Sequence, residues 1–454
     1  MNLHRLLVER AQANQPIRVG IIGAGKFASM FLAQALHTRG IHIMAVCDIE
    51  VARARATLDR LDWPQGRAVV TSFAQAVRDG TTYITDDAAG LIAADHMEVV
   101  VDCTGDPSAG IRHALACFDA GRHIVMVNVE ADTLAGPLLA QRAAQAGVVY
   151  SLAYGDQPAL IAEMVDWARA TGFNVVCAGK GTKYLPQYHA STPDTVWQYY
   201  GLTPEQATAS HMNPKMFNSF LDGTKSAIEM AAVANATGLT PAPEGLAFPP
   251  CGVDALPQVL KPHDAGGLLH HKGTVEVVSS LNRDGSEVER DLRWGVYVTF
   301  EAPSDYAASC FGEYGLVTDD SGHYSALYRP FHLIGLELGI SIASVALRGE
   351  ATGRARGFVG DVVATAKRDL AAGEVLDGEG GYTVWGKLMP ATDSLSIGGL
   401  PIGLAHNVKL VNARAAGEAI HWQDVEVDES SEAVKIRREM ETSFQPPHSV
   451  SATG

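Results

Sequence analysis

The residues in this chain best suited to acid–base chemistry are a lysine and a glutamate spaced four apart, Lys225 and Glu229. This spacing places both side chains on one face of a helix. Their neighbours are mainly Ala, Val, Ile and Met, so the pair predicts a polar stripe that faces a pocket. A lysine there can stabilise a developing alkoxide while a carboxylate relays a proton. Asp222, just upstream, joins this candidate catalytic group. The competing interpretation is a surface ion pair worth about 0.2–0.5 kcal/mol.

Two further lysines lie in the sequence Gly-Lys-Gly-Thr-Lys, at positions 180 and 183. It follows an apolar run at 173–178, so we expect a loop at the end of a strand. Glycines beside Lys180 permit close approach of a substrate. Lys180 and Lys183 are therefore candidates for binding a substrate phosphate or polarising a carbonyl. The alternative is a pair of solvated surface lysines.

Glu130 and Asp156 each come shortly after a predicted strand. Carboxylates at strand ends can lie near a nicotinamide or bind Mg²⁺ or Mn²⁺. Both are candidate metal ligands. Asp156 can equally cap a helix, because Pro158 suits a first helical turn.

A glycine turn near the N-terminus is the strongest motif. Residues 17–22 are apolar, the turn follows, and a helical pattern begins at Lys26. Gly23 permits the tight turn, Gly25 lets backbone approach a pyrophosphate, and Ala28 lets the helix pack on the strand. The stretch predicts a site for NAD or NADP. Its expected contacts are Gly23, Ala24, Gly25, Lys26 and Phe27.

Asp48 follows the second apolar run, about where an acid meets the adenosine ribose. A carboxylate there favours NAD, because it repels a 2′-phosphate. Arg53 and Arg55 follow closely and could hold that phosphate, or could form a solvated helix face. The choice between NAD and NADP stays open.

The elements that must position these residues alternate between strand and helix in the first third of the chain. We expect strands at 17–22, 41–47, 98–103, 123–127 and 148–152, with helices at 26–38, 108–120 and 134–146. This rhythm predicts a parallel sheet with right-handed crossovers. The loop Cys103-Thr104-Gly105 should border the nicotinamide. Asn128, after the fifth apolar run, is a further expected cofactor contact.

Beyond residue 150 the pattern changes. Helices are expected at 158–171, 224–237 and 328–348, the last packing back onto the first domain. Strands at 273–281 and 291–302 flank Asn-Arg-Asp-Gly, which predicts a hairpin. Short strands and glycine turns follow from 361. We expect an α/β protein: a doubly wound Rossmann domain over 1–150, an α+β substrate domain over 151–360, a small β-rich domain over 361–430, and a tail over 431–454 with a disordered end.

Length and composition exclude several classes of protein. The 454 residues require more than one core, and 47% hydrophobic with 19% charged residues suits a globular protein. The net charge of −16 argues against a general nucleic-acid or anionic-membrane binder. The six cysteines form no C-x-x-C motif, which argues against a zinc ribbon or a thioredoxin-type site. Several of them lie in apolar runs, and we expect a reducing cytoplasm. We expect no signal peptide and no membrane span, a small-molecule substrate, and a homo-oligomer.

Several stretches resemble the homoserine dehydrogenase superfamily. Asp102 to Gly105, Ala120 to Val125 with Asn128, Gly181 to Tyr184, and Asn213-Pro214 with the helix at 225–237 carry this resemblance, which spans roughly 17–350. The chain departs from the family at two points. Val129 and Glu130 follow Asn128 where the family has a lysine, and Lys225 precedes Glu229 where the family has the acid first. These departures argue against homoserine as the substrate.

The C-terminal part resembles a SAF domain at 366–376, 400–405, Gly417 and Asp424-Val425. Both parts together resemble deoxyxylulose-phosphate-reductoisomerase-like (DRL-type) enzymes. The sequence is most similar at 153–159, 179–186 and 216–229. This resemblance implies NADPH-dependent rearrangement and reduction of deoxyxylulose phosphate with a divalent metal. The substrate would then be a phosphorylated sugar or polyol.

Two alternatives remain at this point. One is simple dehydrogenation of a homoserine-like alcohol or a polyhydroxy acid. The other is a non-catalytic protein in which the SAF-like tail recognises a sugar and the first domain senses the nucleotide. The lysine–glutamate pair in an apolar helix argues against this second alternative.

Overall fold

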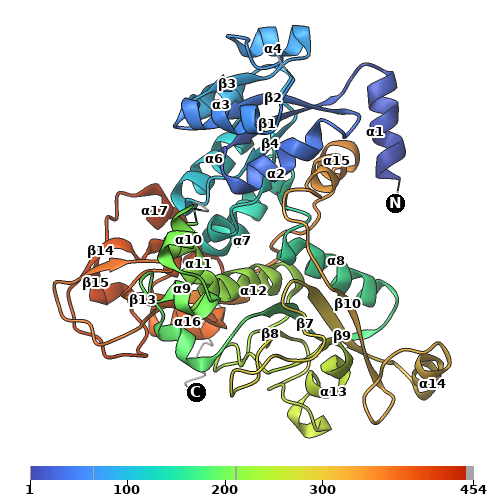
Figure 1. Ribbon diagram of the computed structural model, residues 1–454, viewed down its shortest axis with the longest axis vertical. Helices are drawn as coiled ribbons and strands as arrows, with labels where there is room; N and C mark the ends of the chain where they lie inside the picture. The colour runs from blue at the N-terminus through green and yellow to red at the C-terminus, as the bar shows by residue number, and fades with distance from the viewer. Residues whose placement is uncertain (1, 65, 210–211, 446–454) are drawn as a thin grey trace, which may run out of the picture.

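A six-stranded parallel sheet forms the N-terminal part of the protein (Figure 1). The computed structural model describes residues 2–64, 66–209 and 212–445. The strand order is β3-β2-β1-β4-β5-β6, the doubly wound arrangement expected of a dinucleotide-binding domain. Its strands are β1 (Ile17–Ile22), β2 (Ile41–Cys47), β3 (Tyr83–Thr85), β4 (Val99–Asp102), β5 (His123–Met126) and β6 (Tyr150–Leu152). The predicted fold class is confirmed, and β3 is an addition to the predicted strands.

The helices of this part cover the sheet, whose central strands are Val- and Ile-rich and buried. They are α1 (Leu3–Gln12), α2 (Lys26–Ala35), α3 (Val51–Arg60), α4 (Phe73–Asp79), α5 (Ala88–Ala93), α6 (Pro107–Asp119) and α7 (Val129–Gln145). Helix α7 begins five residues before the predicted start at 134. The Asn128 side chain accepts a hydrogen bond from the Ala131 N–H and so caps the helix. This earlier start places Glu130 in the first turn of α7.

A second sheet has the order β10-β9-β7-β8. Its strands are β7 (Asn174–Thr182), β8 (Thr274–Ser279), β9 (Val296–Glu301) and β10 (Tyr324–Arg329). The predicted hairpin of 273–281 with 291–302 is wrong, because β7 lies between β8 and β9 and pairs with both. The turn at Asn282 to Gly285 does form, but it closes only the short bridge from Leu281 to Glu287.

The predicted helix over 328–348 is also wrong in its first half. Residues up to Arg329 belong to β10, and α15 covers only Gly339–Arg348. Pro330 disfavours helical backbone at Arg329, which is extended and ends β10. Proline also lacks the N–H that a longer strand would need for pairing. The α15 helix does pack onto the first domain as expected: Leu338, Ile342 and Val345 share a core with β1 and β4.

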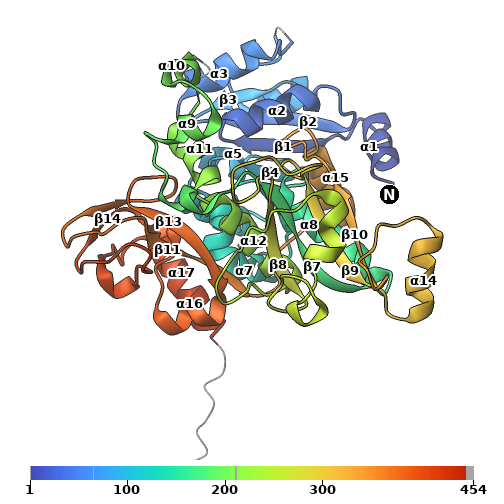
Figure 2. The same ribbon diagram turned by 60° about the horizontal axis from the view of Figure 1, so that its bottom comes forward.

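Helix α12 (Thr224–Thr237), predicted with the correct bounds, lies at the centre of the molecule (Figures 1 and 2). It contacts α7 of the first domain, α8 and β8 of the second, and β11 and β13 of the third. Every α12 residue except Lys225 is buried. An all-round apolar helix of this kind needs neighbours on every side.

The other helices of the middle part are α8 (Gln157–Ala170), α9 (Val196–Tyr200), α10 (Pro204–Ala209), α11 (Pro214–Leu221), α13 (Leu256–Val259) and α14 (Asp305–Glu313).

The C-terminal part consists of short strands, as expected, in two small sheets, β11-β13 and β12-β14-β15. Its elements are β11 (Gly360–Ala366), β12 (Val375–Asp377), β13 (Val384–Pro390), α16 (Ala391–Ile397), β14 (His406–Leu410), β15 (Val425–Glu426) and α17 (Glu432–Ser443). Helix α17 packs on α6 and α7, and its buried Arg437 pairs with Asp361 of β11 at 2.5 Å. The domain boundaries stay predictions. The disordered end falls at 446–454, outside the described residues.

Among the residues described, we find no helix with the length and apolar character needed to cross a membrane.

Candidate active site

The glycine turn after β1 leaves the start of α2 open to solvent. Gly23 has φ +95°, and a Cβ there would lie 2.8 Å from the Cys103 carbonyl oxygen, so only glycine fits. A Cβ on Gly25 would meet no atom within 4 Å. Gly25 and Lys26 are exposed, while Ala28 is fully buried against the sheet. The first N–H groups of α2, from Gly25 through Phe27, therefore face open space suited to a pyrophosphate.

Asp48, directly after β2, is hydrogen-bonded both to the glycine turn and to α3. Its carboxylate accepts hydrogen bonds from the Ala24 N–H at 2.8 Å and from the Arg53 guanidinium at 2.6 Å. Hydrogen bonding to Asp48 raises the pKa of Arg53. Asp48 is buried, but the Arg53 side chain is 48% exposed. Arg53 can thus reach a bound nucleotide while its charge is partly compensated.

The loop after β4 is held by a buried carboxylate that was not among the predicted site residues. Asp102 accepts hydrogen bonds from Thr104 Oγ1 at 2.8 Å and pairs with His113 Nδ1 at 2.5 Å. Asn128 Nδ2 donates to the Asp106 carbonyl at 2.7 Å. Together they fix Cys103, Thr104 and Gly105 at the carboxyl edge of the sheet, as expected for the nicotinamide side. The sequence signals for Asp102 were its place at the end of an apolar run and in the stretch Asp102 to Gly105 that carries the family resemblance.

Six charged residues gather where α7, α8, β7 and α12 meet the C-terminal part. We refer to them as the charged cluster: Glu130, Asp156, Lys180, Lys225, Glu229 and Glu379. The Lys225 ammonium donates to the Glu130 carboxylate, and the Lys180 ammonium donates to Glu229. Lys180 also donates to Gln157 Oε1 at 2.7 Å. Helices α7 and α12, strand β7 and the N-terminal cap of α8 thus bring five sequence-predicted residues together.

The electrostatics of the charged cluster differ from residue to residue. Burial lowers the pKa of Lys225, but Glu130, Glu379, Glu229 and Asp156 together raise it well above its usual value. Burial and the Glu229 charge raise the pKa of Asp156 to about 6. Burial, and next the Glu130 charge, raise the pKa of Glu379 to about 8. The arrangement therefore combines a permanent cation with carboxyl groups that titrate near neutral pH, as acid–base catalysis requires.

Lys180 does not lie in a loop, which corrects that prediction. It lies within β7, and the residue is 4% exposed. Its flanking glycines are needed for packing within the sheet. A Cβ on Gly179 would lie within 2 Å of the Glu276 carbonyl oxygen, and a Cβ on Gly181 within 2 Å of the Leu292 carbonyl oxygen. Neighbouring backbone, rather than substrate, approaches closely there. The Lys180–Glu229 pair is buried, so it can hold the neighbouring charged side chains of the cluster in position.

Two other predicted catalytic residues lie outside the charged cluster. Lys183 Nζ donates to the Tyr199 carbonyl at 2.5 Å and lies 5.7 Å from the centre of the Tyr200 ring. Asp222 is fully buried, pairs with Lys367 at 2.7 Å, and accepts from the Thr224 N–H at the start of α12. The structure thus gives Asp222 a role in positioning α12.

The predicted metal ligands do not fit a metal ion as they are arranged. Glu130 is engaged by Lys225, and Asp156 accepts the Gln157 N–H at 2.8 Å as the cap of α8. Within 2–64, 66–209 and 212–445, no three His, Cys, Asp or Glu side chains form a group that could hold a metal ion. The Lys225 ammonium supplies positive charge among these carboxylates.

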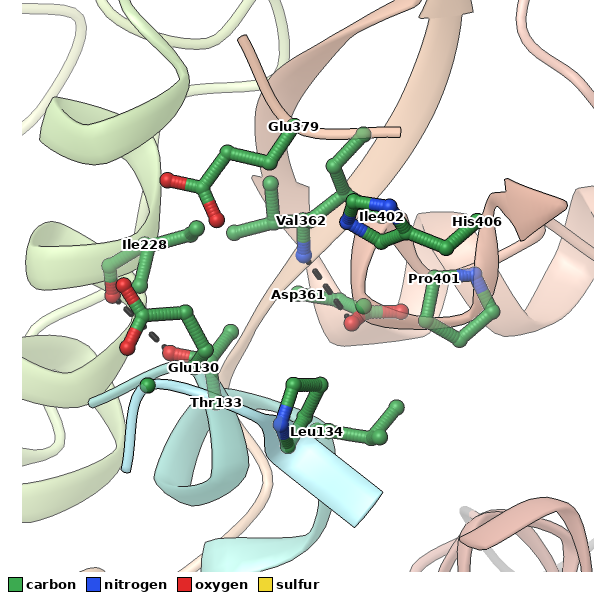
Figure 3. A pocket seen from close by; sticks show the side chains of 13 residues that line it. Glu130, Thr133, Leu134, Ile228, Asp361, Val362, Glu379, Pro401, Ile402 and His406 are labelled. Atoms are coloured by element: carbon green, nitrogen blue, oxygen red, sulfur yellow. Dashed lines mark hydrogen bonds between the residues drawn. The ribbon is translucent and has the colours of Figure 1, made fainter. Parts of the chain in front are cut away.

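The C-terminal part forms one wall of the site. A cavity of about 30 Å³ lies between Gly105 of the β4 loop, Pro107 at the start of α6, Glu130 of α7 and the C-terminal residues Glu379 and His406. Figure 3 shows the carboxylates of Glu130 and Glu379 on the side of the cavity nearest to α12. Glu379 was not predicted, although an acid within Asp-Gly-Glu-Gly-Gly is an unusual feature. The cavity joins the nicotinamide-side loop to the charged cluster.

Two family models match the chain. Residues 17–127 match an oxidoreductase family with an NAD-binding Rossmann fold. Residues 155–338 match the catalytic domain of oxidoreductase DRL. The chain is therefore an NAD(P)-dependent oxidoreductase, and the non-catalytic alternative is set aside. The second match supports the resemblance to DRL-type enzymes. Neither match supports the relationship to homoserine dehydrogenases or the SAF-like domain, which stay predictions.

One curated relative is a 1-deoxy-D-xylulose 5-phosphate reductoisomerase of Anaeromyxobacter dehalogenans, 29% identical over 224 residues. The match covers 48% of this chain and 49% of the relative, so the chain spans about half of the relative's length.

The solved structures that match parts of this chain include a probable dehydrogenase from Thermotoga maritima and a myo-inositol dehydrogenase from Lactobacillus casei. The first is 13% identical, with a TM-score of 0.37 over 74% of this chain and 90% of the other. The second is 15% identical, with a TM-score of 0.28 over 40% and 50%. Similarities this low say nothing about the substrate.

Proposed function

We propose that the enzyme transfers hydride between NAD(P) and a carbonyl carbon of a small phosphorylated polyhydroxy substrate, bound between the β4 loop and the charged cluster. The observation that carries the proposal is the position of Lys225. It is the one residue of α12 that is only partly buried, and it pairs with Glu130 of the domain that holds the cofactor. A substrate carbonyl beside Lys225 would lie at the nicotinamide edge of the sheet.

Each group of the cluster has a distinct role in this proposal. Lys225 stabilises negative charge on the substrate oxygen as hydride reaches the carbon. Asp156, with a pKa of about 6, exchanges a proton with a substrate hydroxyl. Glu379, with a pKa of about 8, is mainly protonated at pH 7 and can donate a hydrogen bond. Lys180 and Glu229 are buried and act as positioning residues.

More specifically, we propose that the enzyme is a reductoisomerase. In that reaction the ketose 1-deoxy-D-xylulose 5-phosphate rearranges to a branched aldehyde. Hydride from NADPH then adds to the aldehyde carbon and a proton to its oxygen, which yields 2-C-methyl-D-erythritol 4-phosphate. The match of 155–338 to a DRL catalytic domain and the curated relative support this choice of substrate.

A second candidate is plain dehydrogenation of a polyhydroxy acid or alcohol. It is favoured by the absence of a three-ligand metal group in the described part of the chain, since the resemblance implies a divalent metal for the rearrangement. In this case Lys225 alone supplies the positive charge at the substrate oxygen.

One screen separates the two candidates. Absorbance of the reduced nicotinamide is followed with deoxyxylulose phosphate, other ketose phosphates and polyhydroxy acids, with and without EDTA. Consumption of NADPH with deoxyxylulose phosphate that stops on chelation supports the reductoisomerase. Turnover of a polyhydroxy acid that is insensitive to EDTA supports the dehydrogenase. No turnover with any carbonyl or alcohol substrate would overturn both.

A further inference from the structure

A second hollow lies on the molecule, separate from the cavity at the charged cluster. This groove of about 530 Å³ runs between α8, α15 and the linker of residues 349–356 that leads toward β11. Residues of both α8 and α15 line it, and Figure 1 shows α15 beside the first domain with α8 below it. The groove shares no lining residue with the cavity. The hydride-transfer site therefore leaves it unused.

Four arginines from three elements line the groove. Arg169 lies in the last turn of α8, Arg348 ends α15, and Arg354 and Arg356 lie on the linker. All four side chains are accessible to solvent. Guanidinium groups stay charged at any ordinary pH and match the geometry of phosphate oxygens.

The acidic residues of the groove only partly balance this charge. They are Glu163, Asp166 and Glu350. Glu163 already accepts a hydrogen bond from the Tyr154 hydroxyl at 2.5 Å, and Glu350 lies 3.9 Å from Arg348. In the part of the chain that the structure describes, neither Arg354 nor Arg356 has a carboxylate oxygen within 4.0 Å.

Two of the arginines are held close to each other. Arg169 Nη1 donates to the Thr237 carbonyl at 2.6 Å, and the backbone N–H of Arg356 donates to the Asn235 carbonyl at 2.8 Å. The Arg169 guanidinium and the backbone of Arg356 are thus both held at the end of α12. Burial lowers the pKa of Arg169, and the nearby Arg356 charge lowers it further. Like charges fixed side by side repel one another, and a bridging anion relieves the repulsion.

We propose that this groove binds a phosphorylated small molecule, with its phosphate between Arg169, Arg354 and Arg356. The remainder of the groove is partly apolar, lined by Val165, Ala236 and Ile340, among others. It can therefore cover the body of an organic phosphate. Inorganic phosphate and a phosphate ester share the recognition chemistry, and the experiment below distinguishes them.

The groove is connected to the segment that carries Asp156. The Gly353 carbonyl on the linker accepts the Leu152 N–H at 2.7 Å, and Thr352 Oγ1 donates to the Leu152 carbonyl at 2.9 Å. Tyr154, two residues before Asp156, lines the groove. A ligand there would contact the chain that positions the catalytic carboxylate, which makes the groove suited to an effector.

Titration calorimetry on the protein saturated with NADP⁺ tests the proposal, because the cofactor then fills its own phosphate site. The ligands are sodium pyrophosphate, sodium phosphate and glycerol phosphate. The test variant is Arg354→Gln/Arg356→Gln, and the control is Arg78→Gln/Arg290→Gln, which removes two exposed arginines elsewhere. Loss of two charged hydrogen-bonding groups should weaken binding about 100-fold, and the control should bind like the wild type.

Tighter binding of glycerol phosphate than of inorganic phosphate supports an organic phosphate as the ligand. The reverse order supports free phosphate. The proposal is overturned if the wild type binds none of the three anions, or if the test variant binds them as tightly as the wild type. Unchanged NADP⁺ affinity and melting temperature show that the variant is folded. Arg169→Gln provides a second variant, in which the loss of one charged group should weaken binding about tenfold.

Discussion

Lys225, in the first turn of α12, donates a hydrogen bond to Glu130, in the first turn of α7, across 95 residues of sequence. The contact joins the domain that holds the cofactor to the helix at the centre of the substrate domain. Both side chains are largely shielded from solvent, at 17% and 14% exposure. Partly buried pairs interact more strongly than exposed ones, so Glu130 helps to keep Lys225 in place and protonated.

Glu130→Gln is expected to lower kcat without changing the affinity for NAD(P). The amide keeps a hydrogen-bond acceptor but removes the largest charge that raises the pKa of Lys225. The Glu130 charge also raises the pKa of Glu379. The pKa values of Lys225 and Glu379 should therefore both fall, and the decline of activity that Glu379 sets should move to a lower pH than in the wild type. Kinetics across pH with cofactor titrations check this. An identical pH profile in the variant would remove Glu130 from the site.

Gly25→Ala is expected to weaken NAD(P) binding by about tenfold or more while leaving the melting temperature of the free enzyme unchanged. A Cβ at Gly25 meets no protein atom within 4 Å, so it would clash only with a bound pyrophosphate. Gly312→Ala in α14 is the matched control, since a Cβ there also meets no neighbour. Equal cofactor affinity in both variants would contradict this location of the pyrophosphate.

Arg53→Ala is expected to weaken NADP⁺ by about tenfold and to leave NAD⁺ nearly unchanged. The Asp48 carboxylate is already occupied by the Ala24 N–H and by Arg53, whereas the half-exposed guanidinium can contact a 2′-phosphate. Dissociation constants for both nucleotides, measured by fluorescence quenching, check the prediction. A variant that loses both nucleotides equally would show that Arg53 acts through the turn and not through the phosphate.

The dependence of kcat/KM on pH should be bell-shaped, with apparent pKa values near 6 and 8. Asp156 must be ionised to accept a proton, so activity rises as the pH passes about 6. Glu379 must be protonated to donate, so activity falls as the pH passes about 8. Because the groups interact, these values belong to the cluster.

Asp156→Asn should remove the acidic limb of this profile together with most of the activity, and Glu379→Gln should remove the basic limb. A profile in Asp156→Asn with an unchanged acidic limb would assign that limb to another group.

The sequence signals that predicted correctly were local. The glycine turn at 23–25, the apolar strands and the apolar helix at 224–237 depend on neighbouring residues, so the first sheet and α12 could be predicted. The pairing of β7 with both β8 and β9 depends on contacts across about 100 residues, and a turn signal at 282–285 could not reveal it.

The charged cluster was predictable only in part, for the same reason. Lys225 and Glu229 stand out because they interrupt an apolar helix. Glu379 reaches the site only because the C-terminal part folds back onto α7 and α12. Lys183 is also a lysine and stands only three residues after Lys180. It follows the end of β7, however, and its side chain donates to the Tyr199 carbonyl instead.

Single-turnover hydride transfer in Lys225→Met tests the central claim most directly. NADPH oxidation is followed after mixing enzyme, cofactor and the substrate identified by the screen, with Lys409→Met as a control because Lys409 is an exposed lysine on the C-terminal part. If Lys225 stabilises the charge on the substrate oxygen, Lys225→Met should lose about 10²–10³ in rate with unchanged NADPH affinity, and Lys409→Met should react at the wild-type rate. Hydride transfer at the wild-type rate in Lys225→Met would contradict this role.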